Sequence, residues 1–198
     1  EEGDLGSGKI VLIAVGKAAW QMAKVAAEQL RGRLSDGVVI TKYDHVKGEI
    51  PGIRCFEAGH PVPDTNSFAA TEAALKAVQG LTEQDTVLFL LSGGGSALFE
   101  KPLVPAEELE SVTNQLLASG ADIIEINTVR KRISGVKGGR FAQHCLPAKV
   151  YSVILSDIIG DPLDMIASGP ACADQSTCAK AKAVIEKYQI KLRKETLE

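Results

Sequence analysis

The sequence is poor in aromatic residues, has no long hydrophobic run and carries no excess of positive charge. Phe, Trp and Tyr make up 5% of its 198 residues, so few side chains could stack on the bases of a single-stranded nucleic acid. Lys and Arg number 22 against 25 Asp and Glu, and this balance gives no general attraction for nucleic acid or anionic lipid. Apolar runs such as residues 11–15 are far shorter than the roughly 18 residues of a membrane span. We therefore expect neither a nucleic-acid-binding nor a membrane protein.

Cysteine and histidine are also scarce, which restricts metal and redox chemistry. The four Cys form no C-x-x-C pair and the three His form no H-E-x-x-H pair. We expect no catalytic zinc site and no disulfide framework, and predict reduced, mostly buried thiols. The acidic start at residues 1–4 does not resemble a signal peptide, so a soluble cytoplasmic protein is expected.

What the sequence does contain is a regular alternation of strand-like and helix-like segments. Short apolar runs rich in β-branched residues predict strands at residues 9–15, 37–41, 53–57, 86–91 and 149–155. Amphipathic or Ala-rich segments predict helices at residues 17–30, 66–79, 106–118, 122–134 and 177–188. Two prolines restrict residues 59–64 to a fixed extended turn. Strands separated by crossover helices predict one α/β domain over residues 1–198, a Rossmann-like three-layer sandwich with a mostly parallel sheet.

Gly16 and Lys17 follow the first predicted strand. In α/β sheets, ligands bind at the carboxyl ends of the strands, and the N–H groups that begin the next helix favour an anion. The ammonium group of Lys17 would add a positive charge there. An ordinary turn with a solvated lysine explains the same residues equally well.

A glycine-rich run follows the fourth predicted strand and is the strongest local signal. Its backbone can approach a phosphate or carboxylate closely, a use that explains consecutive glycines better than a flexible turn does. Leu98 stands where a dinucleotide fingerprint or a nucleophile elbow would need glycine. The predicted anion-binding residues are Ser92, Gly93, Gly94, Gly95 and Ser96.

Two further segments carry clustered charge. Residues 127–140 contain five cations and no acid, which indicates a site for an anionic ligand, although a solvated helix face is the usual alternative. Residues 156–170 contain three acids in a loop with Gly and Pro. Asp157 follows a predicted strand, where its carboxylate could hold magnesium or accept a proton. Asp161 and Asp164 could instead cap turns.

Taken together, five segments resemble the glycerate 2-kinase family of the MOFRL type. They are residues 15–19, 59–64, 91–98, 127–140 and 155–170, and the resemblance covers about residues 10–190. The resemblance implies transfer of the γ-phosphoryl group of ATP to the 2-hydroxyl of D-glycerate, giving 2-phosphoglycerate and ADP. It also implies ATP and Mg²⁺ as cofactors.

Site residues follow from the same resemblance. Lys17 and Asp157 match catalytic positions, and Asp157, Asp161 and Asp164 match an acidic loop that would hold the metal. Substrate or phosphate contacts are implied for Ser92, Gly93, Gly94, Gly95, Ser96, Asn127, Arg130, Lys131, Lys137, Gly138 and Ser168. The sequence departs from the family where Arg132 replaces a common His and Ala171 a common Thr.

The family has two domains with the active site between them, so we expect this chain to be a partial N-terminal domain without its C-terminal MOFRL domain. That domain, D-glycerate and ATP are the expected partners, and formation of a homo-oligomer is left open. Two other functions remain as alternatives. One is a hydroxypyruvate reductase, a name that some relatives carry, although no nicotinamide fingerprint is present. The other is a non-catalytic domain that binds a phosphorylated or carboxylated metabolite.

Overall fold

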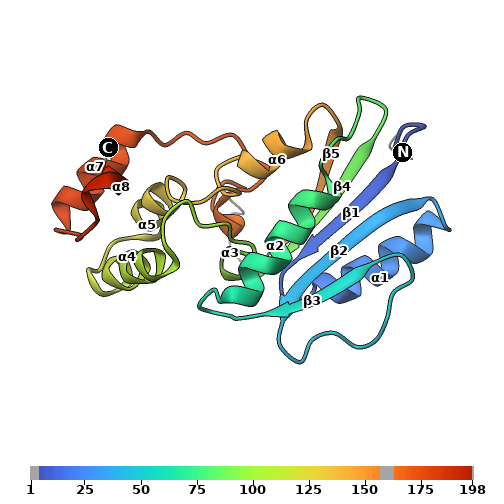
Figure 1. Cartoon of the computed structure of the whole chain (residues 1–198), viewed down its shortest axis with the longest axis horizontal. Helices are drawn as coiled ribbons and strands as arrows, with labels where there is room; N and C mark the ends of the chain where they lie inside the picture. The colour runs from blue at the N-terminus through green and yellow to red at the C-terminus, as the bar shows by residue number, and fades with distance from the viewer. Residues whose placement is uncertain (1–4, 157–162, 198) are drawn as a thin grey trace.

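A five-stranded parallel sheet forms the centre of the molecule (Figure 1). The computed structural model describes residues 5–156 and 163–197. The strands are β1 (Ile10–Val15), β2 (Leu34–Lys42), β3 (Arg54–Ala58), β4 (Thr86–Ser92) and β5 (Lys149–Leu155). Their order is β3-β2-β1-β4-β5, and every pair is parallel. The strand order reverses between β1 and β4, so the predicted Rossmann-like class is confirmed and its expected ligand edge lies where these two strands end.

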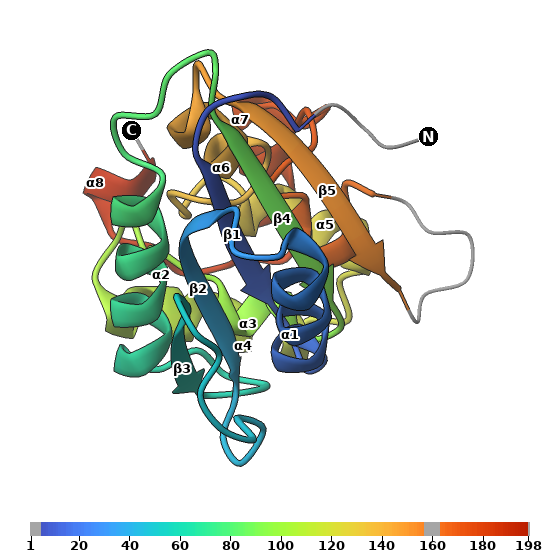
Figure 2. The same ribbon diagram turned by 90° about the vertical axis from the view of Figure 1, so that its right-hand side faces the viewer.

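Helices cover both faces of the sheet (Figure 2). One face packs against α1 (Ala19–Leu30), and the other packs against α2 (Thr65–Ala77), α3 (Gly95–Leu98) and α6 (Arg140–Cys145). Side chains alternate along β1, with Val11 and Ile13 in the core under α2 and Leu12 and Ala14 in the core under α1. Both sides of β1 are therefore buried, which explains its unbroken apolar sequence.

A second group of helices lies to one side of these layers. It consists of α4 (Ala106–Ala118), α5 (Ile123–Arg130) and α7 (Cys178–Lys187), with the short α8 (Lys194–Leu197) nearby (Figure 1). These helices share their own hydrophobic cluster, which includes Leu109, Val112, Val129 and Val184. Figure 1 shows that α4 and α5 lie near the carboxyl ends of the strands and do not cover a face of the sheet.

Local capping fixes where several helices begin. Asp64 accepts a hydrogen bond from the N–H of Ser67 and begins α2, and Asp122 does the same for α5 with Glu125. α5 ends at Arg130, four residues earlier than predicted. The residues after it turn back through Gly138 and Gly139, both at positive φ. The segments α3, α6 and α8 and a 3₁₀ turn at Ile166–Ser168 were not predicted, because each is too short to show periodicity.

All four cysteines are unpaired in the structure. The expectation that most are buried is wrong, because only Cys145 is buried while Cys178 is exposed. Burial raises the pKa of the Cys145 thiol to about 12. Among the residues described, no helix is long and apolar enough to cross a membrane.

Candidate functional site

The turn after β1 is bonded directly to the end of β4. The N–H of Lys17 donates to Gly93 O at 2.9 Å, and the N–H of Ala18 donates to Ser92 Oγ at 3.0 Å. Gly16 has φ +122°, and a Cβ there would lie 2.2 Å from Ser92 Oγ, so only glycine fits. The expectation that N–H groups at the start of α1 bind an anion is therefore not met by Lys17 and Ala18. The exposed Lys17 side chain is the group that this turn leaves available.

The glycine-rich loop runs between His60 and Lys17. Gly94 has φ +88°, and a Cβ there would lie 3.0 Å from the His60 ring and 3.4 Å from Lys17 Cγ. Within the described residues, the N–H groups of Gly94, Gly95 and Ser96 donate to no protein acceptor. The loop thus brings three unused backbone donors next to a lysine side chain, an arrangement suited to an anion.

His60 lies in the turn at residues 59–64 and was not among the predicted site residues. Burial, and then the positive charges of Lys17 and Lys42, hold its pKa below the ordinary histidine value. The lowered pKa favours the neutral form of its ring. The close approach to Gly94 identifies it as a member of the site, and only the fold reveals that approach.

Lys137 and Arg130, two cations among the predicted contact residues, hydrogen-bond to the end of the loop. Lys137 is fully buried, and its Nζ lies 2.8 Å from Ser96 O, 2.9 Å from Phe99 O and 3.1 Å from Glu100 Oε2. Burial lowers the Lys137 pKa to about 8, although the Glu100 carboxylate opposes the shift. Arg130 also donates to Ser96 O, at 3.3 Å. Both side chains therefore hold carbonyl groups of the α3 turn in place. Direct contact of Lys137 with a ligand stays a prediction.

A chain of side-chain hydrogen bonds joins three of the predicted segments. Ser96 Oγ lies 3.1 Å from Ser168 Oγ, which in turn donates to Asn127 Oδ1 at 2.8 Å. The N–H of Gly138 donates to Ser168 O at 3.0 Å. Ala167 and Ser168 have φ of +51° and +62°, a strained conformation for residues with a side chain. The glycine-rich loop, the basic stretch and the end of the acidic loop therefore meet at one place.

The remaining charged residues form a separate cluster around Lys131. Its buried Nζ lies 3.7 Å from Asp164 Oδ2 and 3.5 Å from Asp174 Oδ1, and Asp174 also pairs with Arg132. Asp157 and Asp161 lie outside the described residues. Among residues 5–156 and 163–197, no group of three His, Cys, Asp or Glu residues is arranged to hold a metal ion.

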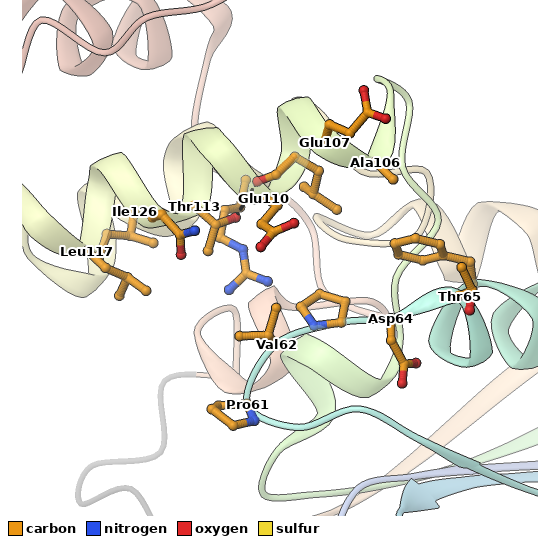
Figure 3. A pocket seen from close by; sticks show the side chains of 15 residues that line it. Pro61, Val62, Asp64, Thr65, Ala106, Glu107, Glu110, Thr113, Leu117 and Ile126 are labelled. Atoms are coloured by element: carbon orange, nitrogen blue, oxygen red, sulfur yellow. Dashed lines mark hydrogen bonds between the residues drawn. The ribbon is translucent and has the colours of Figure 1, made fainter.

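A pocket of about 560 Å³ lies between α4 and the turn at residues 61–65 (Figure 3). Figure 3 shows Glu110, Thr113 and Leu117 of α4 on one side and Pro61 and Val62 on the other. Arg130, which contacts Ser96 O, is also part of the lining. The pocket therefore adjoins the loop through Arg130 on one side and through Pro61, the neighbour of His60, on the other.

The fold and site define a class. This is a Rossmann-like α/β domain with a glycine-rich loop, an exposed lysine and buried cations at the switch point of its sheet. The chain belongs to the family described as a domain of unknown function, DUF4147, whose model matches residues 2–198.

Some similar proteins are named glycerate kinase, and others are named hydroxypyruvate reductase. A D-glycerate 2-kinase from Thermotoga maritima is 57% identical over 184 residues, covering 92% of this chain and 44% of that protein. The crystal structure of glycerate kinase from T. maritima matches with a TM-score of 0.93 and 55% identity, over 96% of this chain and 46% of that one. A protein from Agrobacterium vitis named for hydroxypyruvate reduction is 43% identical, covering 93% of this chain and 42% of that protein. The chain thus spans less than half the length of these relatives.

Proposed function

We propose that this chain is part of an ATP-dependent glycerate 2-kinase, which phosphorylates D-glycerate at the 2-hydroxyl and releases ADP. The observation that carries the proposal is the meeting of Lys17 with the unused N–H groups of Gly94, Gly95 and Ser96 where β1 and β4 end. The 57% identity to a D-glycerate 2-kinase supports the choice of substrate.

Phosphoryl transfer needs positioning and charge neutralisation more than covalent help from the protein. In the proposed mechanism, the Lys17 ammonium and the loop N–H groups neutralise charge on the transferring phosphoryl group. Lys137 and Arg130 hold Ser96 O and so fix the direction in which the loop donors point. Asn127 and Ser168 fix the Ser96 side chain.

The proton of the 2-hydroxyl needs an acceptor. Asp157 is the residue implied by the family resemblance, and His60 is a second candidate because its ring lies against Gly94 and its lowered pKa favours the neutral form. Replacing each in turn separates them, because loss of the acceptor lowers kcat.

The proposed kinase uses Mg²⁺, which would be held by Asp157, Asp161 and Asp164 and, when bound, would supply positive charge against the phosphates of ATP. Of these, Asp164 is described, and its carboxylate faces the Lys131 ammonium at 3.7 Å. By themselves the described residues do not form a magnesium site.

A second domain of the full-length protein is part of the proposed enzyme. Because the chain spans less than half the length of its relatives, we propose that it is the N-terminal part of a two-domain cytoplasmic enzyme. A C-terminal MOFRL domain would close the other side of the site. The 198 residues alone are then expected to bind anions but not to catalyse.

The test is an ADP-release assay with D-glycerate, ATP and magnesium, run on the full-length protein and on this chain alone. The expected result is 2-phosphoglycerate from the full-length protein only. Oxidation of NADH on adding hydroxypyruvate would instead support the reductase, the name carried by the Agrobacterium vitis relatives. Binding of glycerate without turnover would support a metabolite-binding domain.

A further inference from the structure

The pocket between α4 and the turn at residues 61–65 is larger and more apolar than D-glycerate requires. Its volume of about 560 Å³ is in the range that encloses a drug-sized ligand, whereas glycerate has three carbons and little apolar surface. Val62 and Leu117 line it, and they are 51% and 65% exposed. These walls suit a ligand with a flat apolar part.

Polar groups on α4 are available inside this pocket. Glu110, Thr113 and Leu117 lie at helical spacing on the side of α4 that lines it (Figure 3). Throughout the described part of the chain, the side chains of Glu110 and Asn114 have no hydrogen-bond or ion-pair partner. A carboxylate can accept hydrogen bonds from hydroxyl and amino groups, and an amide can both accept and donate them.

Arg130 marks the end of the pocket nearest the loop. Its side chain is 12% exposed, and its Nη2 donates to Ser96 O at 3.3 Å and lies 4.0 Å from Glu100 Oε2. A guanidinium has five N–H donors, so it can bind a phosphate oxygen while it keeps these contacts. Because Glu110 would repel a phosphate, the anionic end of any ligand belongs at Arg130 and the neutral end beside α4.

We propose that this pocket binds the nucleoside part of ATP, with the phosphates passing Arg130 to reach Gly94–Ser96. The base would contact Val62 and Leu117, and Glu110 would accept hydrogen bonds from the sugar hydroxyls. The inference rests on the proposed kinase function and adds where the nucleotide lies. Glycerate is then left to the Lys17 and His60 side of the loop.

The test compares two tryptophan substitutions on α4 in the full-length protein. Glu110→Trp fills the pocket, whereas Ser111→Trp adds the same side chain at a neighbouring exposed position outside it. ADP affinity is measured by calorimetry, and KM for ATP and for D-glycerate by ADP release. Leu117→Asp, at another exposed position, is a second probe of the apolar wall.

For Glu110→Trp and Leu117→Asp we expect ADP affinity to fall and KM for ATP to rise, each by about tenfold or more, since the ligand loses its pocket. KM for D-glycerate should stay within about twofold, as should all values for Ser111→Trp. Unchanged ADP affinity in both pocket variants would overturn the inference, and so would a rise in the glycerate KM alone. If the unaltered protein binds ADP but does not phosphorylate glycerate, the kinase proposal fails while the ADP comparison still decides the pocket. If it does neither, both fail.

Discussion

Lys137 and Glu100 form an ion pair of 3.1 Å in which neither side chain is exposed to solvent. The same ammonium group reaches Ser96 O and Phe99 O, two carbonyl groups of the turn that follows the glycine-rich loop. Because the pair is buried, each charge depends on the other. The position of the loop therefore depends on Glu100, a residue that was not predicted as part of the site.

Replacing Glu100 tests this dependence. Glu100→Gln leaves Lys137 buried without its counter-charge and should lower the free energy of unfolding by about 3–5 kcal/mol. Glu72→Gln removes the exposed Glu72–Lys101 pair and should cost about 1 kcal/mol or less. Urea unfolding of both variants measures the difference. Equal losses would mean that the buried pair has no special role.

The conformation of Gly94 gives a second prediction. Gly94→Ala and Gly80→Ala both place alanine at positive φ, +88° and +72°, and each should cost about 1 kcal/mol of stability. Only the Cβ at Gly94 meets neighbours, the His60 ring and Lys17, since nothing lies within 4 Å at Gly80.

We therefore expect Gly94→Ala to lower kcat/KM for glycerate phosphorylation by about tenfold or more, because a 1 Å misplacement is costly in catalysis. Gly80→Ala should leave it unchanged. Initial rates in the full-length protein measure both. Wild-type kinetics in the Gly94 variant would show that the loop does not need its observed path.

The contact of Glu125 on α5 with Lys187 and Tyr188 at the end of α7 gives a third prediction, about acid stability. Lys187 Nζ lies 2.6 Å from Glu125 Oε1, and Tyr188 donates to Glu125 Oε2 at 2.7 Å. These hydrogen bonds, that of Lys187 first, lower the pKa of Glu125 to about 2. The carboxylate therefore stabilises the fold above its unfolded pKa of about 4.3, and this contribution is lost as the pH falls towards 2.

Glu125→Gln should accordingly flatten the decline in unfolding free energy between about pH 4.3 and pH 2. Glu186→Gln on the exposed side of α7 removes one carboxylate without touching this contact and is the matched control. Chemical unfolding across the pH range gives the slope. If both variants follow the unaltered protein, the contact does not govern acid stability.

Most of the architecture could be predicted because its signals are local. Strong apolar runs predicted β5 at its observed bounds, and Pro105 before an amphipathic stretch predicted α4 at its observed bounds. The end of α5 could not be predicted, since the residues after Arg130 leave the helix to pack against Ser168 and Gly169, a tertiary contact.

The site was predicted less completely. The glycines of the loop and the clustered cations can be recognised in the sequence. In the fold, two of these cations, Arg130 and Lys137, contact Ser96 O of the loop. Glu100 and His60 were not assigned to the site because an isolated acid and an isolated histidine have no spacing signal. Their importance comes from burial beside Lys137 and from approach to Gly94, which depend on segments far apart in the sequence.

The central claim is that the Lys17 ammonium acts on a transferring phosphoryl group. Its most direct test is ADP release by the full-length protein with D-glycerate after Lys17→Met, compared with Lys24→Met on the exposed side of α1. We predict that kcat falls by about 10²–10³-fold or more for Lys17→Met, with an unchanged unfolding transition, and stays unchanged for Lys24→Met. Formation of 2-phosphoglycerate by Lys17→Met at a rate near that of the unaltered protein would contradict the account.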